Sequence, residues 1–145
     1  MTIAHRQLGV DLFNEVWRLM KSREDDERMV HAAHASRFHW GEAPECKPEN
    51  LARGEWQVSR VYSVLGRAEP ALYHARRCVE IYEEMASGRE DWELGSAYEA
   101  MARALAVAGD RGASDEWRSR AVGELAKIAD SEDRQVLEQD LATLP

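Results

Sequence analysis

Apolar residues recur along this chain at steps of three and four positions. Near the start of the sequence, Leu8, Leu12, Val16 and Leu19 fall on one face of a helix predicted from about Thr2 to Lys21. This step matches the turn of an α-helix, whereas a half-buried strand would alternate with a period of two. The same spacing continues to the other end of the sequence. The pattern therefore predicts an all-α fold.

Glycine, proline and capping residues divide this pattern into seven predicted helices. The segment Ser22–Asp25 is typical of a helix start, and Pro48 and Pro70 suit a first helical turn. Gly66 and Gly109 suit the left-handed residue that ends a helix. The expected helices run from about Thr2 to Lys21, from Asp25 to His39, from Pro48 or Asn50 to Gly66, across Pro70 to Ser87, from Trp92 to Ala108, from Ala113 to Ile128 and from Ser131 to Leu141.

Part of the sequence repeats at an interval of 43 residues. Val58–Gly66 aligns with Met101–Gly109, so that Arg60 falls on Arg103 and Gly66 on Gly109. The same interval places His31, His74 and Trp117 at one repeat position. A fixed period of this length indicates a helical array. We therefore expect one domain over residues 1–145, with three antiparallel helix pairs at about 2–40, 50–85 and 91–128 and a C-terminal capping helix at 131–142.

The stretch from Val61 to Tyr82 resembles a tetratricopeptide repeat. In that family an aromatic residue precedes a turn glycine and small residues follow on the second helix, a pattern matched by Tyr62, Gly66, Ala71, Ala75 and Cys78. The chain departs from the family in its longer period and in lacking the closing proline. It is also similar to small bacterial proteins of this type. The resemblance implies an array whose first helices line a groove for an extended peptide, and it implies no catalytic activity.

The resemblance makes Trp56, Arg60, Ser63 and Arg103 candidate ligand-binding residues, because they lie on first helices. Paired arginines there would suit a ligand carboxylate or phosphate. The alternative is that each arginine pairs with an acid of its own chain, and Glu55 and Glu99 lie nearby on the same helices. The sequence leaves both interpretations open.

Glu55 is the only charged residue in the apolar stripes of the third and fifth predicted helices. The repeat puts Leu12 and Tyr98 at its equivalent positions. A buried carboxylate is costly unless it is paired, bound to metal or protonated. Glu55 is thus either a structural ion-pair partner of Arg60, Arg53 or a histidine, or a catalytic candidate together with His74 and Arg60.

Histidines gather on the second and fourth predicted helices. We expect these helices to pack about 8–10 Å apart. His31, His34 and His74 would then reach one ion with Glu55 between them, a ligand set suited to zinc, iron or copper. The competing interpretations are ordinary core or surface histidines, and acid–base chemistry without a metal. The metal hypothesis predicts one cavity lined by His31 or His34, Glu55, Arg60 and His74.

Charge and composition narrow the choice of partners. The net charge is −8, and no run of Lys or Arg is longer than Arg76–Arg77, which disfavours nucleic acid and anionic membranes. We find no signal peptide and no apolar run near the length of a membrane span. Cys46 and Cys78 lack metal-knuckle spacing, as expected of reduced thiols in a cytoplasm. We therefore expect a cytoplasmic binding or scaffolding module for a peptide or small anionic ligand, and a metal-binding protein or metal-dependent enzyme is the alternative.

Overall fold

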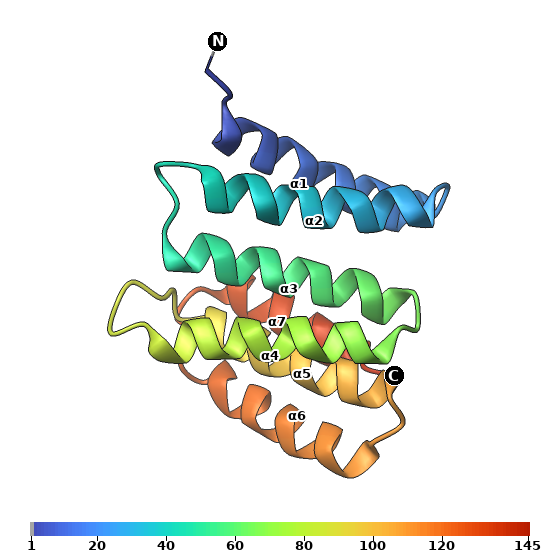
Figure 1. Ribbon diagram of the computed structural model, residues 1–145. Helices are drawn as coiled ribbons and strands as arrows, with labels where there is room; N and C mark the ends of the chain where they lie inside the picture. Colours follow the sequence, from blue (N-terminus) through green and yellow to red (C-terminus); the bar gives the residue numbers. More distant parts are fainter. Residues whose placement is uncertain (1) are drawn as a thin grey trace.

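The computed structural model describes residues 2–145, so Met1 of the predicted domain lies outside the described residues. Seven α-helices and no strands form this part of the chain (Figure 1). They are α1 (His5–Ser22), α2 (Asp26–Glu42), α3 (Pro48–Val64), α4 (Ala68–Glu84), α5 (Glu93–Val107), α6 (Arg111–Leu125) and α7 (Ser131–Ala142). The all-α prediction is confirmed. Among residues 2–145, none of the helices has both the length and the apolar sequence that spanning a membrane requires.

The helices pack in consecutive pairs. α1 packs on α2, α3 on α4 and α5 on α6, while α3 also contacts α2, and α5 also contacts α4. The expected direct packing of α2 on α4 is wrong, because no Cα atoms of these two described helices lie within 8 Å of each other. α3 lies between them (Figure 1). They meet only through side chains, with the rings of His34 and His74 centred 5.5 Å apart.

The interval of 43 residues is visible in the backbone. Arg23, Gly66 and Gly109 follow the first helix of each pair, and all three have positive φ angles, of 55°, 72° and 84°. The two glycines adopt this left-handed conformation without the steric cost that a side chain imposes at Arg23. The capping hydrogen bond from Arg67 N to Tyr62 O, at 2.9 Å, recurs 43 residues later, from Asp110 N to Leu105 O at 3.0 Å. The repeated helix ends support the repeat.

A buried hydrogen bond also recurs between the two helices of a pair. The hydroxyl of Ser59 on α3 donates to the carbonyl of Ala71 on α4 at 2.8 Å. In the next pair the hydroxyl of Ser114 on α6 donates to the carbonyl of Ala102 on α5 at 2.7 Å. These positions are again 43 residues apart, and only the direction of the bond is reversed. Both pairs therefore share one packing register.

Several helix boundaries differ from the sequence expectation, and at the starts of α6 and α7 an aspartate side chain supplies the cap. Asp110 accepts a hydrogen bond from Ala113 N, so α6 begins at Arg111. Asp130, rather than Ser131, caps α7 by accepting from the backbone of Glu132 and Asp133. A carboxylate at either position satisfies amides that the first helical turn leaves unpaired. α2 continues past Gly41 to Glu42, and α4 ends at Glu84 before the Ser87–Gly88 pair.

Candidate functional site

Glu55 is buried on α3 with two basic partners. Its side chain is 10% exposed, its Oε2 accepts from Nδ1 of His74 at 2.6 Å, and its Oε1 accepts from Nε of Arg37 at 3.1 Å. Arg37 reaches it across Gly54, where an added Cβ would lie 2.8 Å from the Arg37 side chain. The expected histidine partner is thus present, whereas Arg37 was not foreseen. Glu55 joins α2, α3 and α4.

The environment of Glu55 favours its charged form. Burial alone raises the pKa of this carboxyl group, but the hydrogen bonds and positive charges of His74 and Arg37 outweigh burial and lower its pKa below the ordinary value. A carboxylate bound in this way orients His74 through its Nδ1 atom. The Nε2 atom is then the ring nitrogen left for another interaction.

His34 completes the polar cluster around Glu55 and His74. Its Nε2 atom lies 2.8 Å from the hydroxyl of Tyr62, and its ring meets that of His74 edge to face. Burial, followed by the neighbouring charge of His74, lowers the pKa of His34. Lowering the pKa favours a neutral imidazole, the form that binds metals and accepts protons.

His31 lies outside this cluster. Its side chain is 76% exposed, and Nε2 lies 3.6 Å from Glu27 on the same helix. Its repeat position is shared with His74, but its neighbours are different. Among residues 2–145 no three His, Cys, Asp or Glu side chains converge as a metal site would require. His34, Glu55 and His74 of the predicted metal set are neighbours, although they do not converge on one point, and His31 lies apart from them.

Arg60 lies among groups from α5 and α7 and does not join Glu55 and His74. Its Nη2 atom is 3.0 Å from Asp140 and 3.6 Å from Glu99. Its guanidinium group also lies over the ring of Trp56, 5.6 Å from the ring centroid. The predicted grouping of Arg60 with the histidines is therefore not present. Arg60 instead connects α3 with α5 and α7.

Arg103 is held by the same buried acid and by the end of α7. Its Nε donates to Glu99 at 2.8 Å, and its Nη2 donates to the Asp140 carbonyl at 2.7 Å and to the Thr143 hydroxyl at 2.9 Å. Glu99 is fully buried. Burial raises its pKa, and the charges of Arg103 and Arg60 only partly oppose that effect. Both candidate arginines thus have acidic partners within the chain.

Three of the four candidate ligand-binding residues, Trp56, Arg60 and Arg103, share one stripe of the first helices. We call this stripe the first-helix face. Its members lie at three repeat positions, each with a spacing of 43: Val10, Arg53 and Ser96; Phe13, Trp56 and Glu99; Trp17, Arg60 and Arg103. The rings of Trp17 and Trp56 are tilted against each other with centroids 5.6 Å apart, and Phe13 meets Trp17 edge to face. Phe13, Trp17 and Trp56 therefore form a continuous aromatic row from α1 to α3.

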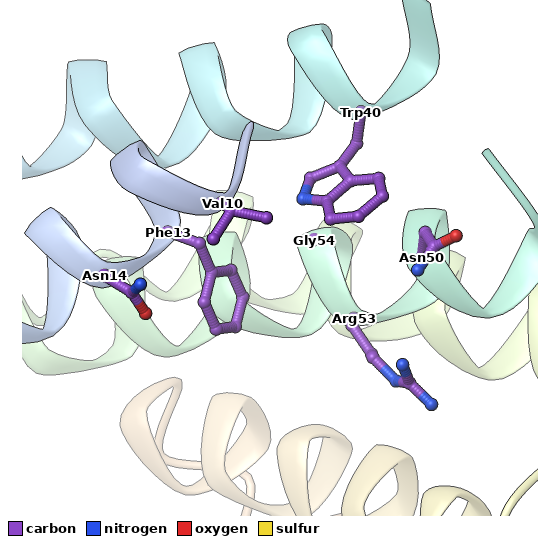
Figure 2. A pocket seen from close by; sticks show the side chains of 7 residues that line it. All are labelled: Val10, Phe13, Asn14, Trp40, Asn50, Arg53 and Gly54. Carbon is purple, nitrogen blue, oxygen red and sulfur yellow. The ribbon is translucent and has the colours of Figure 1, made fainter. Parts of the chain in front are cut away.

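Two adjacent cavities open along the first-helix face. The larger, of about 350 Å³, lies between α1, α3, α4, α5 and α7 and is lined by Phe13, Arg53, Trp56, Tyr82, Trp92, Ser96, Val136 and Asp140. The smaller, of about 130 Å³, is shown in Figure 2 and is lined by Val10, Phe13, Asn14, Trp40, Asn50, Arg53 and Gly54. Phe13 and Arg53 line both cavities. The first-helix face thus contains two neighbouring cavities with largely apolar linings.

Polar groups at this face differ in how well they are paired. Arg53 donates from Nε to Glu93 at 2.7 Å and lies over the Trp92 ring. In contrast, Trp56 Nε1 at this face and the Ser63 hydroxyl, which lies further along α3 outside the face, are buried and have no hydrogen-bond partner among residues 2–145. A buried donor without a partner carries a desolvation cost that a ligand acceptor would relieve. The predicted pair Trp56 and Ser63 therefore retains unused hydrogen-bonding capacity.

Sequence reasoning missed Phe13, Trp92 and the whole contribution of α7 to this face. The repeat did contain a signal for Phe13, since it stands 43 residues before Trp56. Comparison with protein-family models, curated proteins and solved structures finds no match for the chain.

Proposed function

We propose that the protein is a binding module of the tetratricopeptide-repeat-like type, which takes a peptide segment of a partner on the first-helix face. The observation that most supports this proposal is the larger cavity at this face. Its volume of about 350 Å³ falls within the size range of ligand-binding pockets. Its lining combines the rings of Phe13, Trp56 and Trp92 with a few polar groups, as expected of a pocket that buries an apolar side chain.

Charge at the face favours an apolar group over a free anion. Arg53 pairs with Glu93, Arg60 with Asp140, and Arg103 with Glu99. A phosphate or carboxylate bound there would compete with these acids and would approach Asp140, which lines the cavity. Of the two expected ligand classes, a peptide is therefore supported better than a small anion.

One segment of α5 supports a repeat of the tetratricopeptide-like type. Leu94, Gly95 and Tyr98 match the Leu-Gly-x-x-Tyr segment of the tetratricopeptide pattern. Gly95 packs so closely that an added Cβ would lie 2.6 Å from Leu137 and 3.1 Å from Glu124.

The two cysteines support a cytoplasmic location. Cys46 and Cys78 are free thiols, as expected of a protein in a reducing compartment.

A peptide-library selection tests this proposal. Peptides enriched on the wild-type chain should bind at least about tenfold more weakly to the Phe13→Ala variant, because Phe13 lines both cavities. The matched control is Tyr73→Ala, since Tyr73 is an exposed aromatic residue on α4 that lines neither cavity. Enriched peptides that bind both variants like wild type would show that the first-helix face is not the binding site.

A second candidate function rests on the cluster of His34, Glu55 and His74. The hydrogen bond of 2.6 Å from His74 Nδ1 to Glu55 is the arrangement that orients metal-binding or proton-accepting histidines. We propose it as the alternative, a metal-binding protein or metal-dependent enzyme that would hold zinc, iron or copper once these side chains move closer together than they lie in this structure. Elemental analysis of the purified, tag-free protein tests it. A stoichiometric metal that is lost in His74→Ala would support it, and metal-free protein would contradict it.

A further inference from the structure

α7 lies along the first-helix face as a separate segment. It contacts α5 and α6 and passes behind α3 and α4 in the view of Figure 1. Two of its side chains, Val136 and Asp140, form part of the wall of the larger cavity. The proposed binding face thus already holds a helix of its own chain over part of its length.

The C-terminal end of α7 is held by the two arginines that the sequence assigned to a ligand. Arg60 pairs with the Asp140 carboxylate, while Arg103 donates to the carbonyls of Asp140 and Thr143 and to the Thr143 hydroxyl. Carbonyls at the end of a helix lack partners within the helix, and a cation there also suits the helix dipole. The arginines therefore recognise a helix end together with an acidic side chain.

Apolar contacts of α7 are few and separate from the main core. Only Leu137 and Leu141 are buried on this helix, and they form a small cluster with Ala121 and Ile128. Leu137 lies over Gly95, which leaves room for it by lacking a Cβ atom. The remaining side chains of α7 are exposed or partly exposed. A segment held by so few buried side chains is expected to open locally at lower cost than the main helices.

We infer that α7 is an internal ligand of the first-helix face, and that an amphipathic helix of a partner protein binds there in its place. The partner helix carries an acidic residue near its C-terminal end for Arg60, free terminal carbonyls for Arg103, and two apolar residues four positions apart, as Leu137 and Leu141 are in α7. This inference rests on the proposed function and adds the kind of partner and the step that exposes the site.

The experiment uses a synthetic, fluorescently labelled peptide of residues 129–145 as the probe. It is titrated against the full-length wild-type chain and against a full-length Leu137→Ala/Leu141→Ala variant, whose own α7 is weakly held. We expect the peptide to bind the variant at least about tenfold more tightly than wild type, because the competing internal helix is released. Replacing Asp140 by Ala in the peptide should weaken binding at least about tenfold, whereas replacing the exposed Glu138 should not.

Equal binding to both chains, or no binding to a variant that keeps its helical circular dichroism, would overturn the inference. Amide hydrogen exchange on the wild-type chain covers the case in which the variant does not fold. The amides of Leu137 and Leu141 should then exchange faster than those of Val58 and Val61 in α3. If the amides of all four residues exchange only when the whole protein unfolds, the inference about α7 would also be overturned. The peptide-library test varies Phe13 on α1, whereas the displacement experiment varies residues of α7, so the result of either experiment can fail without the other.

Discussion

Glu55 and His74 occupy the two positions in the second helix pair that Tyr98 and Trp117 occupy in the third. The first pair of residues meets through a hydrogen bond of 2.6 Å, and the second through aromatic rings centred 5.6 Å apart. Both contacts join the first helix of a pair to the second. The second helix pair thus has a polar contact at the position where the third pair has an aromatic one. The hydrogen bond between Glu55 and His74 therefore joins the two helices of its pair, whether or not these residues also bind a ligand.

This equivalence predicts that tyrosine and tryptophan, the residues at positions 98 and 117, can replace Glu55 and His74 together. Glu55→Tyr and His74→Trp should each lower the free energy of unfolding by about 1–3 kcal/mol, because each leaves a buried polar group without its partner. The double variant should recover part of that loss, with a coupling of about 1–2 kcal/mol. Urea denaturation of the four chains measures this. Strictly additive losses would show that the two positions do not form equivalent contacts.

Acid should weaken the protein partly through Glu55. Its pKa is lower in the folded chain than in the unfolded one, so the stability it contributes is present above the unfolded pKa and is lost as pH falls through the folded value. The loss should therefore appear below about pH 4.5, the ordinary value for this group. Denaturation of wild type and Glu55→Gln across this range measures the effect. The variant should depend less steeply on pH, and parallel curves would contradict the assigned pairing.

A side chain at Gly95 should displace Leu137. A Cβ there would lie 2.6 Å from Leu137 and 3.1 Å from Glu124, so Gly95→Ala should cost about 1–3 kcal/mol of stability and loosen α7. Gly123→Ala is the matched control, since nothing lies within 4 Å of its added Cβ within α6. That change should stabilise the helix by about 0.5–1 kcal/mol. Thermal unfolding of both variants gives the comparison, and equal effects would rule out close packing at Gly95.

Arg103 should contribute more to stability than Arg60. Glu99 is fully buried, and Arg103 reaches it at 2.8 Å, whereas Arg60 lies 3.6 Å away. Arg103→Met would leave the buried carboxylate poorly compensated and should cost about 3–5 kcal/mol. The pair Arg103→Met/Glu99→Gln should regain much of this loss. Chemical denaturation tests the order, and a larger effect of Arg60→Met would contradict it.

Local pattern and repeat period were sufficient to predict most of the fold. Gly66 and Gly109 marked helix ends because glycine alone adopts positive φ angles at little cost, whereas Arg23 adopts the same conformation without that signal. The interval of 43 residues also placed Trp56, Arg60 and Arg103 on first helices, where the structure has them. These features depend on neighbouring residues or on the period, both of which are visible in one sequence.

Long-range partners could not be predicted in this way. Asp140 meets Arg60 across 80 residues of sequence, and only the path of α7 brings them together. Arg37 reaches Glu55 because Gly54 leaves space between two helices, a packing detail with no periodic signal. His31 and His74 share a repeat position but differ in burial, because their neighbours differ. The repeat period predicts which face of a helix a residue lies on, whereas tertiary packing determines which residue it contacts.

The indole N–H signals of the five tryptophans report where a peptide binds and so test whether it occupies the first-helix face. In a ¹H–¹⁵N spectrum recorded while a library-selected peptide is added, the signals of Trp40, Trp56 and Trp92 should shift, because these rings line the two cavities. The Trp117 signal should stay in place, since that ring packs against Tyr98 away from the first-helix face. A shift of Trp117 with the three cavity tryptophans unchanged would contradict the account.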